Sequence, residues 1–171
     1  WGFDDFHEAL RAGVEIYHTL KGVLKSRNLS TAVGDEGGFA PNLKDNEDAL
    51  KLCEEATEKA GYKWGEQIFV ALDPATSELW NEAEKDGKTG YKFFSSTNEI
   101  ISTDDLISIW ADWANKYPIR SIEDGLAEND WEGWAKLNAK LGDKVQLVGD
   151  DLFVTNKKFV ERGVKEGSAN A

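Results

Sequence analysis

The hydrophobic positions near the start of the chain predict two helices separated by a turn. Hydrophobic side chains recur at positions 3, 6, 10, 14, 17, 20 and 24, a spacing that buries one face of a helix. The small and β-branched run "STAV" (30–33) predicts a short strand before the turn "GDEGG". Asp45 or Asn46 is expected to cap a second helix, and Gly61 to end it.

The middle of the chain predicts a strand, an excursion and a helix. "QIFVALDPA" (67–75) is typical of a buried strand that ends at Asp73, because Pro74 cannot continue a central ladder. Residues 78–101 carry a glycine-rich turn between two runs and predict a hairpin. Ser102 and Asp105 form an S-x-x-D capping pattern, which predicts the start of the next helix.

The remaining residues continue the same alternation. Strands are expected in "IRSIEDG" (119–125) and "KVQLVGDDLFV" (144–154), and helices at 130–141 and 156–166. About four alternations of strand and helix are typical of βαβ units. The sequence therefore predicts an α/β fold with a parallel sheet, either an open doubly wound sheet or a (β/α)8 barrel.

Composition and charge narrow the class of protein. The chain has 171 residues, of which 40% are hydrophobic, enough for one domain with a real core. A net charge of -12 argues against nucleic-acid or membrane partners, which need a basic surface. Cys53 is the only cysteine, so no internal disulfide can form and a reducing, cytoplasmic location is expected. We find neither a signal peptide nor a membrane-spanning run, and both chain ends look cut.

Four of the predicted strands end in a carboxylate: Glu36, Asp73, Glu123 and Asp150. In parallel α/β folds such strand ends share one side, where active sites lie. Carboxylates that converge there repel one another unless a cation sits between them, and an all-oxygen site suits Mg²⁺. The alternative is that these acids cap helices or form salt bridges at separate places.

The segments that hold these acids resemble successive motifs of one family. "AVGDEGGFAPN", "ALDPATSE", "SIEDGL" and "QLVGDDLFVTN" are similar to motifs of enolase, the glycolytic phosphopyruvate hydratase, in the same order. The resemblance covers almost the whole chain and is weakest at residues 81–95. It implies that residues 1–171 form part of the enolase (β/α)8 barrel domain, without the N-terminal α+β domain or the last barrel strands.

The resemblance also implies a reaction and roles for four residues. Enolase is a lyase that dehydrates 2-phosphoglycerate to phosphoenolpyruvate with Mg²⁺, which stabilises the enolate formed when a base removes a proton. Glu36 resembles the acid that assists departure of the hydroxyl. Asp73, Glu123 and Asp150 resemble the metal ligands. Asp151 is not chosen, because adjacent residues of a strand point to opposite faces.

Other parts of the family pattern fall outside this chain. The family's mobile histidine loop would precede Trp1, and its lysine base would follow Ala171. We therefore expect an active parent enolase, typically a homodimer or larger, and an inactive 171-residue piece. Two alternatives stay open: another lyase of the same superfamily, with a different base, or a non-catalytic binding module derived from an enolase.

Overall fold

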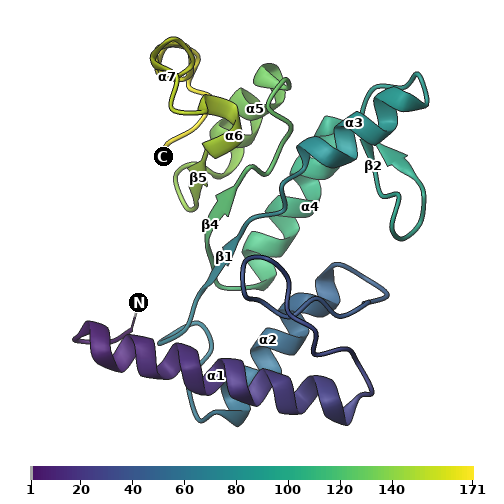
Figure 1. The fold of residues 1–171 in the computed structure, drawn as a ribbon. Helices are drawn as coiled ribbons and strands as arrows, with labels where there is room; N and C mark the ends of the chain where they lie inside the picture. The colour runs from purple at the N-terminus through teal and green to yellow at the C-terminus, as the bar shows by residue number, and fades with distance from the viewer. Residues whose placement is uncertain (1) are drawn as a thin grey trace. The chain divides into compact units, whose positions relative to one another are not determined.

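The computed structural model describes residues 2–171, which divide into two compact units. One unit ends at Phe69, and the other runs from Val70 to Ala171. In chain order the elements are α1 (Phe6–Ser26), α2 (Glu47–Lys59), β1 (Val70–Leu72), α3 (Ser77–Lys85), β2 (Tyr91–Lys92), β3 (Ile100–Ile101), α4 (Thr103–Lys116), β4 (Ile119–Glu123), α5 (Trp131–Leu141), β5 (Gln146–Val148), α6 (Asp150–Phe153) and α7 (Lys157–Glu166) (Figure 1).

The first unit is built on the packing of α1 against α2. Val23 and Leu24 of α1 form a buried cluster with Leu52 and Ala56 of α2, but of these two α1 residues only Leu24 belongs to the predicted apolar face. The helix begins at Phe6 because the Asp5 side chain accepts the backbone N–H of Glu8 and caps its first turn. Phe6, Leu10 and Val14 of the predicted face are exposed, so the hydrophobic spacing predicted the helix correctly but not its buried face, and it placed the start three residues too early.

The α2 boundaries also follow the sequence. The Asp45 side chain accepts the backbone N–H of Glu47 at 2.8 Å, whereas Asn46, the residue before the helix, makes no capping hydrogen bond through its side chain. After the helix, Gly61 has φ +87°, a left-handed conformation that glycine adopts without steric cost. Both predicted ends of this helix are confirmed.

The strand predicted for "STAV" is wrong. Val33 makes only an isolated antiparallel bridge to Phe39. The intervening residues close on themselves, since Gly34 N–H donates to the Gly38 carbonyl and Gly37 N–H donates to the Gly34 carbonyl. A bridge to a residue six positions along makes a tight turn, so no neighbouring strand is left to extend a ladder.

The second unit contains a parallel sheet in the order β1-β4-β5. Ile122 and Leu147, from its last two strands, are fully buried, and so are Trp134 and Leu137 of α5. The helix α4 runs beside β4 (Figure 1). Its predicted start is confirmed, because Ser102 and Asp105 form a reciprocal capping box.

The excursion at residues 78–101 is only partly a hairpin. Its first part is the helix α3, because "SELWNEAEK" lacks glycine and proline and is rich in helix formers. The antiparallel pair β2-β3 follows. Gly90, which has φ +133°, allows this pair to close, since a Cβ there would lie 2.4 Å from the Ile101 carbonyl oxygen.

The last predicted strand is shorter than expected. β5 ends at Val148, and Asp150 already belongs to α6. Beyond α7 the chain returns to β5: Asn170 N–H donates to the Leu147 carbonyl at 3.2 Å, and Gly149 N–H donates to the Ala171 carbonyl at 3.2 Å. The final described residues therefore lie alongside β5, on the side away from β4 in the order of pairing.

Candidate metal centre

The parallel sheet brings three of the predicted acids to one edge. Asp73 directly follows β1, Glu123 is the last residue of β4, and Asp150 comes two residues after β5. The register pairs Leu72 with Ile122 on one side of β4, and Glu123 with Val148 on the other. Because the strands are parallel and end in register, the residues that follow them emerge at the same edge.

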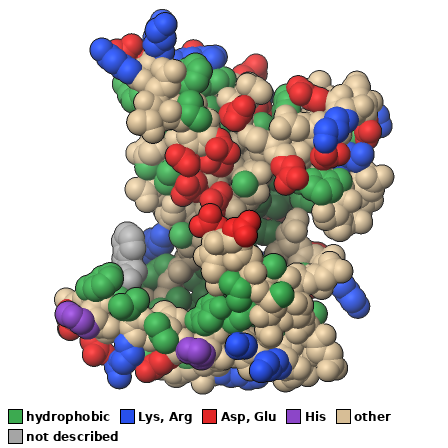
Figure 2. All heavy atoms as spheres, viewed as in Figure 1, with side chains coloured by type: hydrophobic (Ala, Val, Ile, Leu, Met, Phe, Trp, Pro, Cys, Tyr) green, Lys and Arg blue, Asp and Glu red, His purple; other side chains and the backbone are tan. Residues whose placement is uncertain are grey.

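Three carboxylates at this edge converge closely. One side-chain oxygen from each of Glu123, Asp124 and Asp150 lies within 4.8 Å of the others. Figure 2 shows Asp and Glu side chains gathered over the part of the surface where β4, β5 and α6 lie in Figure 1. Asp73, which is exposed, is not a member of this closest group.

Asp73 nevertheless interacts electrostatically with Glu123 of the cluster. The pKa of Glu123 is raised, first by burial and then by the negative charges of Asp73, Asp150 and Asp151. Every one of these influences disfavours the ionised carboxylate. The arrangement is therefore unfavourable for the protein alone, and a cation between the carboxylates would relieve the repulsion.

Sequence reasoning did not single out Asp124. Its side chain is only 4% exposed, and burial raises its pKa to about 6. Alternation along a strand would point it away from Glu123, but Asp124 has φ +43°, so the chain has already turned out of the strand. The left-handed tolerance of Asp, in an acidic pair directly before a glycine, is the signal in "IEDG" that could have indicated this turn.

The structure also changes the reason for preferring Asp150 over Asp151. Both residues lie in α6, so the alternation of side chains along a strand does not apply to them. Asp150 contributes an oxygen to the closest group, whereas Asp151 is tied through its backbone: its N–H donates to Oδ2 of Asp124 at 3.0 Å. The argument from strand geometry was wrong because β5 ends two residues earlier.

Glu36 lies in the first unit, in the turn between Gly34 and Gly38. Its side chain is exposed. The turn is attached to α1 through Tyr17, whose hydroxyl donates to the Gly37 carbonyl at 3.3 Å and whose ring stacks on Phe39 at 4.4 Å between centroids. The sequence placed this acid at the end of a strand, and the structure places it in a short turn held by a helix.

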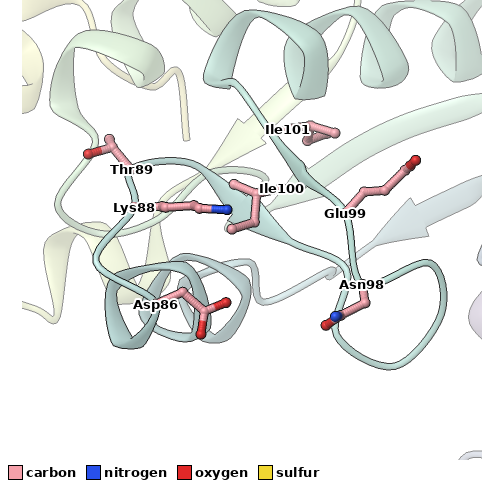
Figure 3. Close-up of a pocket in the computed structure, with 7 residues that line it drawn as sticks. All are labelled: Asp86, Lys88, Thr89, Asn98, Glu99, Ile100 and Ile101. Carbon is pink, nitrogen blue, oxygen red and sulfur yellow. The ribbon is translucent and has the colours of Figure 1, made fainter.

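A hollow elsewhere in the second unit is a weaker candidate for a metal site than the carboxylate cluster. It has a volume of about 740 Å³ and is lined by residues between Asp86 and Ile101. Figure 3 shows Lys88 extending along Ile100, with Asp86 and Asn98 at opposite sides. Asp86 already accepts a hydrogen bond from Nζ of Lys92 at 2.6 Å, which lowers its pKa. The hollow therefore does not gather free carboxylates.

The chemistry of the cluster fits a hard divalent cation. All of its donors are carboxylate oxygens, the ligands that Mg²⁺ and Ca²⁺ prefer. Oδ1 of Asp124 is buried without a hydrogen-bond partner among the described residues. A buried carboxylate oxygen in that state is costly unless a cation or water meets it.

Comparisons with known proteins identify the family of this chain. The family model described as "Enolase, C-terminal TIM barrel domain" matches residues 1–171. Enolase 1 of Chlorobaculum tepidum is 51% identical over 166 residues, which cover 97% of this chain and 38% of that protein. The chain thus spans well under half of that relative's length. The parallel sheet with alternating helices is part of a TIM barrel, and the chain belongs to the enolase family.

Proposed function

We propose that the full protein product of this gene dehydrates 2-phosphoglycerate to phosphoenolpyruvate, as a Mg²⁺-dependent lyase of glycolysis. The observation that carries the proposal is the gathering of carboxylates where parallel strands of an enolase-family barrel end. Family membership supports a small-molecule substrate. A cytoplasmic homodimer or larger assembly, without nucleic-acid or membrane partners, completes the proposal. None of the helices in the described part of the chain has the length and hydropathy to cross a membrane.

Asp73, Glu123 and Asp150 are the proposed ligands of the ion. They lie at or just beyond the ends of three neighbouring strands of the sheet, whose pairing brings these segments together. Bound Mg²⁺ would supply Lewis-acid stabilisation of the negative charge that develops on the substrate carboxylate. The acids themselves orient the ion, and the mutual repulsion that raises the pKa of Glu123 favours its binding.

Glu36 is the proposed acid. In the reaction a base removes the proton from C2 of the substrate, and the bond from C3 to its hydroxyl breaks. A proton from Glu36 would let that hydroxyl leave as water. The base is proposed to be a lysine beyond Ala171, on the strand that residues 170 and 171 begin to align beside β5. We therefore expect no turnover from the 171 residues alone.

The experiment is a turnover assay of the full gene product on 2-phosphoglycerate, followed through the ultraviolet absorbance of phosphoenolpyruvate. We expect activity that a chelator abolishes and Mg²⁺ restores. Glu123→Gln keeps the shape of the side chain and removes its charge, and we expect about a 10³-fold loss, equivalent to several kcal/mol of lost stabilisation.

Glu128→Gln is the matched control. It removes one acid from the loop that follows the same strand, and its side chain is exposed. We expect its activity to equal that of the wild type. Equal loss in both variants, or no turnover of 2-phosphoglycerate by the wild type, would contradict the proposed function. Measurable turnover by residues 1–171 alone would contradict only the proposal that the base lies beyond them.

A further inference from the structure

Asp124 directly follows Glu123 and is hydrogen-bonded to both segments that carry the other two proposed metal ligands, Asp73 and Asp150. Its carbonyl accepts from the backbone N–H and from the hydroxyl of Thr76, at 3.3 and 3.0 Å, in the segment after β1. Its own N–H donates to the Val148 carbonyl at the end of β5. Its Oδ2 accepts the backbone N–H of Asp151 in α6. One buried residue therefore connects the ends of three strands.

The last of these bonds replaces a cap that α6 lacks. Gly149 precedes the helix and makes no side-chain capping bond. A side chain there would be crowded, since a Cβ on Gly149 would lie 3.0 Å from the Phe153 ring and 3.1 Å from Cβ of Leu152. A free N–H at the start of a helix needs an acceptor, and Asp124 supplies it from the neighbouring strand.

The backbone conformation of Asp124 orients its side chain toward the start of α6, where it accepts the Asp151 N–H. At φ +43° the residue is left-handed, a conformation that Asp and Asn tolerate better than most residues. The turn breaks the alternation of β4, so consecutive acids both contribute to the cluster. Thr76, which binds the carbonyl of Asp124, is itself fully buried, and the Val148 carbonyl accepts the N–H of Asp124, so the backbone of Asp124 is hydrogen-bonded on both sides.

We infer that Asp124 is a positioning residue, which holds the start of α6 so that Asp150 faces Glu123 across the metal site. The inference rests on the proposed function, because it assigns Asp150 as a ligand. The rival roles for Asp124 are direct coordination through its unpartnered oxygen and a purely electrostatic contribution. The electrostatic role needs the carboxylate charge, and coordination weakens when a neutral amide oxygen replaces a carboxylate ligand, whereas positioning needs only an oxygen that accepts the Asp151 N–H.

The test is the affinity of the full gene product for Mg²⁺, measured by calorimetric titration without substrate. Asp124→Asn keeps an acceptor oxygen and the tolerance for positive φ, but loses the charge. Asp124→Gly keeps the backbone conformation and removes the acceptor. We expect the Gly variant to bind about 10- to 100-fold more weakly, the usual effect of losing a group that orients a ligand. We expect the Asn variant to stay within about threefold of the wild type.

Asp151→Asn is the matched charge control. It removes one of the acids that act on Glu123 and leaves the backbone N–H in place. Because the Asp151 side chain is exposed, we expect its affinity to change by no more than about threefold. Thermal unfolding of each variant identifies one that has not folded, and Asp124→Ala takes the place of the Gly variant if that variant fails.

The outcomes separate this inference from the proposed function. A folded Asp124→Asn protein that binds Mg²⁺ as weakly as Asp124→Gly would overturn positioning in favour of charge or coordination. Wild-type affinity in both variants would also overturn it, as would the absence of Mg²⁺ binding by the wild type. The expected pattern of affinities in a protein that does not turn over 2-phosphoglycerate would sustain positioning and reject only the proposed reaction.

Discussion

Two acidic turns of similar composition have different surroundings in this chain. "DEGG" at 35–38 and "EDG" at 123–125 each place an Asp and a Glu before glycine. The first turn is closed by its own backbone and leaves both acids exposed. The second follows a central strand, buries Asp124 and half-buries Glu123. The same local residues thus acquire different electrostatics from the pairing of distant segments.

The largest expected effect concerns the acid of the first turn. Glu36→Gln should lower turnover of 2-phosphoglycerate by about 10²- to 10⁴-fold, the usual contribution of a general acid. The affinity for Mg²⁺ should stay unchanged, because Gln at 36 leaves the three proposed ligands intact. Steady-state kinetics and metal titration of the full gene product measure the two quantities.

Asp35→Asn is the matched control for this turn, because it removes the neighbouring exposed charge. We expect turnover close to that of the wild type. A Glu36→Gln enzyme with normal turnover would remove this acid from the reaction. A Glu36→Gln enzyme with weakened Mg²⁺ binding would show that the two turns are not functionally distinct.

The second prediction tests whether the turn at 123–125 responds to metal. Mg²⁺ at 100 times its dissociation constant should stabilise the folded protein by about 2.7 kcal/mol, because the ion binds the native state preferentially. Glu123→Gln should remove most of this stabilisation, and Glu36→Gln should retain it. Denaturant unfolding with and without Mg²⁺ measures this stabilisation. Equal stabilisation of the two variants by Mg²⁺ would contradict the prediction that the turn at 123–125, and not the turn at 35–38, binds the ion.

The contrast also shows how far the sequence could predict this molecule. Hydrophobic spacing predicted the helix α1, and the capping pattern of Ser102 and Asp105 placed the start of α4, because these features depend on neighbours in sequence. The buried positions of α1 were not predicted, because they depend on its packing against α2. Glu123 was singled out by its place at the end of a predicted strand, and the structure places it at the end of β4. The role of Asp124 was missed because it depends on contacts with Thr76 and Asp151, which only the paired strands bring near.

The two wrong strand predictions, at 30–33 and at 144–154, also arise because pairing between segments is not visible in the sequence. "STAV" has the composition of a strand, but within residues 2–171 Val33 bridges only to Phe39, six residues ahead, so no ladder forms. Hydrophobic residues occur on both sides of "GDD" (149–151), but β5 ends at Val148 and the helix α6 begins at Asp150. Strand composition does not reveal where a ladder stops, since a ladder also needs a partner.

The third prediction uses the glycine that follows the second turn. A Cβ on Gly125 would lie 2.8 Å from Cγ2 of Ile122 and 3.5 Å from Cδ2 of Leu137, both fully buried. Gly125→Ala should therefore lower the free energy of unfolding by about 1–3 kcal/mol, the usual cost of an overpacked core. Gly125→Asn should be at least as destabilising, because it adds further atoms to the same space. Denaturant unfolding checks both variants.

The smallest expected effect concerns the glycine in the first turn. Gly37 has φ +82°, and a Cβ there would meet nothing within 4 Å. Gly37→Ala should cost about 1 kcal/mol, because a left-handed backbone is unfavourable for Ala even in open space. Gly37→Asn should recover part of that cost, since Asn tolerates this conformation, whereas Asn at 125 recovers nothing. Denaturant unfolding of the four glycine variants therefore separates a conformational requirement from a steric one. A loss at Gly37→Asn as large as at Gly125→Asn would mean that the first turn is as closely packed as the second.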